Sequence, residues 1–185
     1  ARVEEIVGHR LPADDPDELV KVLGTTALFI GATLRNTSNP TRLAAGYKEN
    51  VIPGEASAVI DCRYLPGNEE RLLRTIQELA GEGIEIQTIQ SAPALETPFE
   101  GALVDRMTEA LLAEDPGAAV LPYALSGGTD NKAFSLLGIT GYGFAPLRLP
   151  AGLNFAGMFH GVDERVPLDS LRFGARTLRR FIRTA

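Results

Sequence analysis

The clearest alternation of apolar and polar positions in the first half of the chain runs over residues 56–65. This period of two predicts a β-strand, and the turn signal Pro53-Gly54 precedes it. The alternation places Asp61 and Arg63 on one face as neighbours along the strand. Two interpretations stay open: an ion pair between them, or an arginine offered to a ligand carboxylate, which suits the guanidinium fork.

The segments around this strand predict a small mixed domain. Residues 33–47 read as extended, but Pro40 favours a loop or an edge over a central strand. Residues 83–89 alternate again and predict a strand. A helix between them begins after Asn68, a plausible N-cap, and its apolar stripe comprises Leu72, Leu73, Ile76, Leu79 and Ala80. With an earlier helix closed by Gly24, and one strand expected before residue 1, the order is that of a ferredoxin-like β-α-β-β-α-β sandwich lacking its first strand.

The pattern changes after residues 91–98, whose two prolines and weak periodicity mark the best linker in the chain. Residues 118–125 are apolar without alternation, as in a strand buried on both faces, and residues 139–144 predict another strand. Helical stripes are expected over residues 99–111, 133–137 and 168–182. The second half therefore predicts part of an α/β layer.

Composition narrows the function. The 185 residues suffice for one domain or two small ones, and 44% hydrophobic with 23% charged residues is typical of a soluble globular protein. A net charge of -6 argues against a nucleic-acid or anionic-membrane binder, since both need a basic surface. Cys62 is the only cysteine, which excludes an internal disulfide and a cysteine-based zinc site, and fits a cytoplasmic location. The chain has neither a signal peptide nor an initiator Met, so we expect a piece of a longer polypeptide.

Two loops in the second half carry candidate chemistry. The first is S-G-G-T-D-N at residues 126–131, either a tight strand-to-helix turn or a ligand-binding loop whose glycines admit a close backbone approach. It lacks the G-K-[ST] of a phosphate loop, and no G-x-S-x-G nucleophile elbow occurs. The second is H-G-V-D-E-R-V, in which His160 is either a metal ligand or a surface histidine before the last helix. Asp163 and Glu164 are close enough in sequence to orient it.

These motifs together resemble a known family. Asn50-Val-Ile-Pro-Gly-Glu55, followed by a strand ending Asp61-Cys-Arg63, resembles the lid domain of the di-zinc amidohydrolases. Gly127-Gly-Thr-Asp130, with His160 about thirty residues later, resembles the end of their catalytic domain. The family includes aminoacylase, succinyl-diaminopimelate desuccinylase, bacterial glutamate carboxypeptidase and related dipeptidases. The resemblance covers essentially the whole chain.

The resemblance implies roles for five residues. Asn50, Arg63, Gly128 and Thr129 would contact the carboxylate and carbonyl of the substrate, and His160 would be the last metal ligand. It also implies two zinc ions in the parent enzyme, a small N-acyl amino acid or peptide as substrate, and a homodimer formed through the lid. The lid can present its asparagine to the active site of the partner.

The chain departs from the family in its metal site. No H-x-D is present, and Glu4-Glu5 and Glu69-Glu70 lie in helical patterns without a nearby histidine. G-H-R at residues 8–10 spells part of a motif in the first lid strand, but it follows a helix and we reject that match. The catalytic base and the other zinc ligands are thus expected outside this chain.

We therefore expect a lid or dimerisation domain over residues 1–92 and the C-terminal segment of a mixed-sheet α/β zinc-hydrolase domain over residues 93–185. The parent would hydrolyse an amide or peptide bond beside a free carboxylate, and the isolated chain would be inactive. The alternative is a non-catalytic dimerisation or binding module. A complete, unrelated α/β binding protein would require all these motifs to be coincidental.

Overall fold

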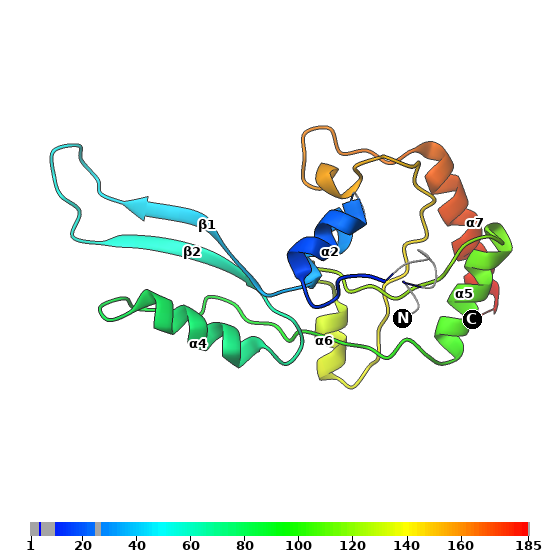
Figure 1. Cartoon of the computed structure of the whole chain (residues 1–185), viewed down its shortest axis with the longest axis horizontal. Coiled ribbons are helices and arrows are strands. Elements are labelled where there is room, and N and C mark those ends of the chain that lie inside the picture. Colours follow the sequence, from blue (N-terminus) through cyan, green and yellow to red (C-terminus); the bar gives the residue numbers. More distant parts are fainter. Residues whose placement is uncertain (1–3, 5–9, 25–26, 185) are drawn as a thin grey trace. The chain divides into compact units, whose positions relative to one another are not determined.

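The computed structural model describes residue 4, residues 10–24 and residues 27–184 (Figure 1). The chain separates into two compact units, one comprising Gly31–Leu95 and the other Ala1–Ile30 with Glu96–Ala185. The boundary at Leu95 falls inside the linker expected from the sequence, whereas residues 1–30 group with the second half of the chain. The division at residues 92 and 93 stays a prediction. No described helix is long and apolar enough to cross a membrane.

The unit Gly31–Leu95 is built on an antiparallel hairpin of β1 (Thr37–Ala45) and β2 (Ala56–Arg63). The strand expected over residues 56–65 is thus confirmed. Pro40 is accommodated because the register shifts between it and Arg42, and a bulge needs no ladder hydrogen bond from the missing N–H. Neither strand is buried along its length, so both faces of the hairpin remain accessible.

Helix α4 (Glu69–Ala80) follows β2 and confirms the helix expected there, although most of its apolar stripe is not buried. Leu72 is its buried residue, and Leu79 is 82% exposed. Asn68 stands at the N-cap, but its side chain makes no capping hydrogen bond and instead donates to the Pro66 carbonyl. The helix begins nonetheless, because the Leu72 amide bonds the Asn68 carbonyl.

The strand predicted over residues 83–89 is wrong: this segment follows α4 without strand pairing. The sheet therefore has two strands, and the ferredoxin-like arrangement expected for the domain is not formed by the described residues. The physical reason is that a strand is completed by a hydrogen-bonded neighbour. In a ferredoxin-like sheet the last strand lies beside the first, and no described segment takes that first position.

Two helices form the core of the other unit. Helix α5 (Ala102–Glu114) packs against α7 (Leu168–Thr184), and both confirm helices expected from apolar periodicity. The buried side chains of these two helices are Val104, Met107 and Ala110 of α5, and Ser170, Phe173 and Thr177 of α7. Glu114 accepts hydrogen bonds from Arg176 Nε at 2.7 Å and from Arg180 Nε at 2.5 Å. These two arginines therefore join the C-terminal end of α5 to α7 and hold the pKa of Glu114 below its usual value.

Shorter elements complete this unit. They are α2 (Pro16–Leu23), α3 (Ala27–Ile30), α6 (Asn131–Leu136) and the 3-10 turn η3 (Ala156–Met158), while a further 3-10 turn, η2 (Gly31–Thr33), opens the hairpin unit. Asp15 caps α2, because its carboxylate accepts from the amides of Asp17 and Glu18 at 3.0 Å each. Apart from Glu4 and Arg10, the helix expected before the G-H-R motif and the motif itself lie outside the described residues.

The strands predicted over residues 118–125 and 139–144 are also wrong, since both segments run without sheet partners in the described part of the chain. Side-chain contacts hold the second segment instead. The Asn131 side chain fills the space that a Cβ of Gly141 would need, and Tyr142 Oη donates to the Pro98 carbonyl at 3.0 Å. An apolar run shows that a segment prefers burial, but it does not supply the neighbouring strand that a sheet requires.

Candidate functional site

Arg63 is the last residue of β2, where three interactions anchor the chain. It pairs with Thr37 in the register of the hairpin. The next two residues are held as well: Tyr64 Oη donates to the Ala92 carbonyl at 2.5 Å, and the Leu65 amide donates to Asn36 Oδ1 at 2.9 Å. The strand end that carries the guanidinium is therefore fixed within its unit.

Asp61 and Arg63 form the ion pair expected as one of the two interpretations. Arg63 Nε donates to Asp61 Oδ1 at 2.5 Å and Nη2 donates to Oδ2 at 2.7 Å, a two-point contact. The hydrogen bonds from Arg63 lower the pKa of Asp61, and those to Asp61 raise the pKa of Arg63. Both side chains stay partly exposed, at 38% and 47%. The Arg63 guanidinium thus binds the Asp61 carboxylate at the surface, where the carboxylate of a ligand could replace it.

Asn50 lies in the loop that joins β1 to β2, at the opposite end of the hairpin from Arg63. The eight residues of β2 span about 26 Å at roughly 3.3 Å per residue. Tyr47 and Ile52, on either side of Asn50, are 85% and 93% exposed. One protomer therefore does not bring Asn50 and Arg63 to the same small ligand, and the loop carries apolar side chains that are open to contact.

The S-G-G-T-D-N loop leads into α6 and is exposed up to Asp130. A Cβ added at Gly128 would meet no atom within 4 Å, so the glycine faces open space. Thr129 accepts from the Lys132 amide at 3.1 Å through its carbonyl, whereas Asp130 makes no side-chain cap. The loop is thus a turn that follows no strand and leads into a short helix, and the space beside Gly128 is open to a ligand.

His160 occupies the third position of a β-turn that follows η3. Phe159 has φ -58 and ψ 128, His160 has φ 59, and the Gly161 amide bonds the Met158 carbonyl at 2.9 Å. These are the features of a type II turn, whose third residue is normally glycine or asparagine. His160 is the one non-glycine residue with a positive φ in the described chain. Its backbone amide donates to Glu164 Oε2 at 3.0 Å.

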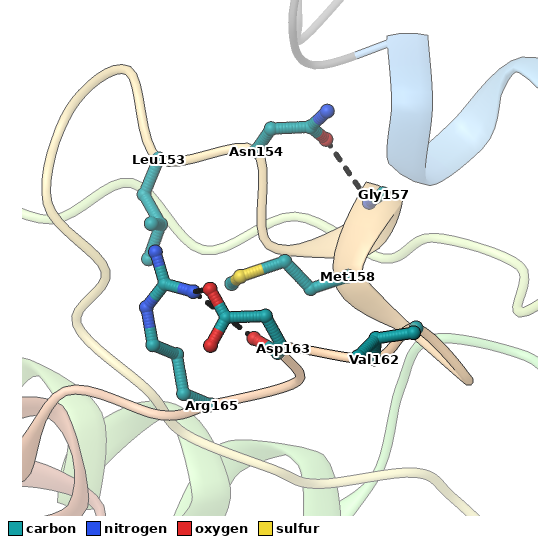
Figure 2. A pocket seen from close by; sticks show the side chains of 8 residues that line it. Leu153, Asn154, Gly157, Met158, Val162, Asp163 and Arg165 are labelled. Atoms are coloured by element: carbon teal, nitrogen blue, oxygen red, sulfur yellow. Dashed lines mark hydrogen bonds and ion pairs between the residues drawn. The ribbon is translucent and has the colours of Figure 1, made fainter.

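A cavity of about 440 Å³ lies beside this turn (Figure 2). Figure 2 shows the Asp163 carboxylate and the Arg165 guanidinium meeting next to Met158, and Asn154 Oδ1 accepting from the Gly157 amide at 3.0 Å. Arg165 also donates to the Asp163 carbonyl at 3.0 Å. The sequence suggested both Asp163 and Glu164 as partners of the histidine. The structure pairs Asp163 with Arg165 and Glu164 with the backbone of His160.

The described residues do not amount to a zinc site. No group of three or more His, Cys, Asp or Glu side chains in the described chain is arranged to hold a metal ion. A hydrolytic zinc site needs three protein ligands and an open position. His160 supplies an exposed imidazole and thus one suitable donor. The donor set of the described chain therefore does not fit a zinc ion by itself.

Comparison with known proteins identifies the family. Residues 9–86 match the peptidase dimerisation domain. The chain is 30% identical over 159 residues to "Putative succinyl-diaminopimelate desuccinylase DapE" of Mycobacterium tuberculosis, an alignment covering 82% of this chain and 40% of that protein. The chain belongs to the peptidase family that is characterised by this dimerisation domain. The resemblance inferred from the sequence motifs is thereby confirmed.

A second relative of this peptidase-family chain is "Probable carboxypeptidase S-like 2" of Dictyostelium discoideum, 28% identical over 154 residues, or 80% of this chain and 29% of that protein. The chain thus spans 40% or less of the length of these curated relatives. No solved structure matches it significantly. The dimerisation-domain match begins at His9, so it takes in part of the G-H-R motif that we had set aside, and it ends within the segment after α4.

The candidate residues of this peptidase-family chain therefore lie at four separate positions. Arg63 and Asn50 stand at the two ends of one hairpin. Within the other unit, the glycine loop precedes α6 and His160 follows η3, and Figure 1 draws α6 and η3 well apart. The left-handed turn and the Glu164 contact could not be read from the sequence, because nothing in the motif marks the turn type when histidine replaces glycine. The only available signal was the acidic pair after His160.

Proposed function

We propose that this chain is the C-terminal portion of a zinc-dependent peptidase or amidohydrolase that cleaves an amide or peptide bond beside a free carboxylate. The observation that carries the proposal is the order within one chain: a peptidase dimerisation domain over residues 9–86, then a G-G-T-D loop, then a late histidine. The relatives are named as a putative succinyl-diaminopimelate desuccinylase and a probable carboxypeptidase, which supports hydrolysis of an amide or peptide bond.

In this proposal Arg63 binds the carboxylate of an N-acyl amino acid or peptide. The two-point contact with Asp61 supports this, because it demonstrates that the guanidinium geometry accepts a carboxylate at the end of β2. A substrate carboxylate would take the place of Asp61. Gly128 and Thr129 line the pocket around the substrate, and the open space at Gly128 permits a close approach.

His160 supplies one metal ligand in the full-length protein. When bound, zinc would polarise the scissile carbonyl and lower the pKa of a bound water. The remaining ligands and the catalytic base lie outside this chain, so we expect the isolated 185-residue chain to be inactive.

Asn50 acts in the site of the partner protomer. Its separation from Arg63 by the length of β2, and the exposed apolar residues beside it, support a contribution across a homodimer. A two-fold dimer then has two identical composite sites, each with Asn50 from one protomer and Arg63 from the other.

A mixing experiment on the full-length protein tests this arrangement. Asn50→Ala and Arg63→Ala proteins are each expected to hydrolyse an N-succinyl amino acid poorly. When the two are unfolded together and refolded as an equimolar mixture, half of the dimers are hybrids with one intact site, which restores about one quarter of wild-type activity. A mixture no more active than its components would place both residues in the same protomer's site and refute the shared-site proposal.

Chelation tests the metal. Full-length activity should disappear with EDTA and return with zinc, and the isolated chain should show no turnover in either condition. Turnover by residues 1–185 alone, lost on chelation, would show that the chain is a complete enzyme.

The competing function is a non-catalytic dimerisation module, favoured by the exposed Leu43, Tyr47 and Ile52 of the hairpin unit. Sedimentation distinguishes the two: a metal-independent dimer, together with a full-length protein that has no hydrolase activity, supports the module. In either case we propose a cytoplasmic location, for which the single cysteine is the support.

A further inference from the structure

We propose that the outer apolar stripe of α7 packs against the apolar face of a β-sheet in the preceding part of the parent protein. The stripe comprises Leu168, Leu171, Ala175, Leu178 and Ile182. The inference rests on the proposed function in one respect, since it takes the chain to be the C-terminal portion of a longer protein. It involves neither a metal nor a substrate.

Helix α7 has two apolar faces and one charged face. The inner face carries the buried Phe173 and Thr177 and packs against α5 (Figure 1). At 3.6 residues per turn, the outer apolar stripe lies roughly 120° around the helix from this inner face. The remaining side carries the charges of the helix: Asp169, Arg172, Arg176, Arg179, Arg180 and Arg183. An amphipathic helix turns its charged side to water, so the outer apolar stripe is an additional face that requires a partner.

The outer apolar stripe is exposed in the described chain. Leu168 is 69% exposed and Ile182 is 70% exposed, whereas Phe173 on the inner face is 6% exposed. Single exposed apolar side chains are ordinary on a protein surface. Here the spacing of three and four residues joins five of them into one row along about four turns of the helix. A contiguous apolar patch of this kind marks a contact surface.

Two other segments of the same unit also lack a neighbour. Residues 118–125 and 139–144 are apolar, and neither is paired with a strand in the described part of the chain. In α/β architectures a sheet is covered by helices, so it supplies both neighbours for extended segments and an apolar face for a helix. One sheet would therefore satisfy the two segments and the outer apolar stripe together.

The length of the relatives identifies where that sheet comes from. The alignment with the desuccinylase covers 82% of this chain but 40% of that protein, so the larger part of the relative has no counterpart here. A second copy of the chain is the other possible occupant. The peptidase dimerisation domain, however, ends at residue 86, before α5 and α7 begin. The homodimer contact thus belongs to the dimerisation domain, and the outer apolar stripe is assigned to the parent polypeptide.

Photo-crosslinking of the full-length protein tests this assignment. One variant carries p-benzoylphenylalanine in place of Ile182, and the matched control carries it in place of Arg183, the next residue on the charged side. Irradiation of the first variant should join position 182 to a peptide that precedes residue 1 in the same polypeptide, and the control should give little of this product. A crosslink to a second copy, or equal products from the two positions, would overturn the inference.

A thermal comparison covers the case in which the crosslinker at position 182 prevents folding. Leu171→Gln should lower the unfolding midpoint of the full-length protein by about 4–8 °C, because a polar amide would be buried against the sheet. Arg172→Gln, the neighbouring change on the charged side, should lower it by less than about 1 °C. Equal midpoints for these two variants would show that the stripe is exposed in the full-length protein and would overturn the inference.

These readouts are independent of hydrolysis. A full-length protein that hydrolyses its substrate but gives no crosslink from position 182 would refute the packing of α7 and leave the proposed function standing. A protein that forms the crosslink but has no hydrolase activity would refute the proposed function and support the packing.

Discussion

Replacement of His160 by glycine should make the protein more stable. A non-glycine residue in the left-handed region costs about 1–3 kcal/mol, and histidine falls toward the lower end because it is enriched there. Glycine removes that cost but adds about 0.5–1 kcal/mol of unfolded-chain entropy. The imidazole is exposed, so its loss removes little packing. The net expectation for His160→Gly is a gain of about 0.5 kcal/mol in the free energy of unfolding.

His160→Ala separates the backbone effect from the loss of the ring. Alanine keeps the Cβ and the strain, so its stability should stay within about 0.5 kcal/mol of wild type. A more stable His160→Gly protein is the expected signature of a residue that is retained at a strained position for a reason other than stability.

Urea unfolding followed by circular dichroism at 222 nm measures the difference. The unit that contains His160 also holds α5 and α7, the two longest helices, so their signal reports on it. The slope of the free energy of unfolding against urea concentration should be equal among the three proteins, since they bury similar surface areas. A His160→Gly protein less stable than wild type would refute the reasoning, because the imidazole would then contribute more to the fold than the strained backbone costs.

Three further changes test the packing and the electrostatics. Gly174→Ala should lower the free energy of unfolding by about 1–2 kcal/mol despite the better helix propensity of alanine, because the new Cβ would lie 2.6 Å from a backbone carbonyl oxygen; a stabilised variant in urea unfolding would contradict this close approach. Leu72→Ala should cost about 2–3 kcal/mol, whereas Leu79→Ala, at an 82% exposed position of the same helix, should cost less than about 0.5 kcal/mol in the same assay. The pKa of Asp61 is lowered, so its pair with Arg63 stabilises the fold above about pH 4 and ceases to do so as the pH falls through the folded-state pKa. In an NMR titration of Arg63→Ala, the midpoint of Asp61 should return to about 3.9. The difference in stability between wild type and Asp61→Asn, a few tenths of a kcal/mol, should vanish by about pH 2.

The motifs alone were enough to recognise the family, and apolar periodicity alone was enough to predict α4, α5 and α7. A helix closes its hydrogen bonds within its own segment, so a local pattern can specify it. The strand over residues 56–65 was predicted for a related reason: its partner β1 is the preceding extended segment, joined to it by a single loop. The positions of Asp61 and Arg63, two residues apart on one strand, predicted that they are neighbours on one face, and the structure shows the ion pair that was one of the two interpretations.

The tertiary structure decided what depends on distant or conformational partners. The segments over residues 83–89, 118–125 and 139–144 have the apolar character of strands but find no neighbour in the described chain, and a sheet requires one. Asn50 and Arg63 were expected to contact substrate, and only the hairpin shows that the two residues of one protomer are separated by the length of β2. His160 was selected by its residue type, but only the backbone revealed its left-handed turn and the carboxylate of Glu164 that holds its amide. The backbone dihedral angles of a turn depend on contacts among several residues, and a sequence motif does not specify these contacts.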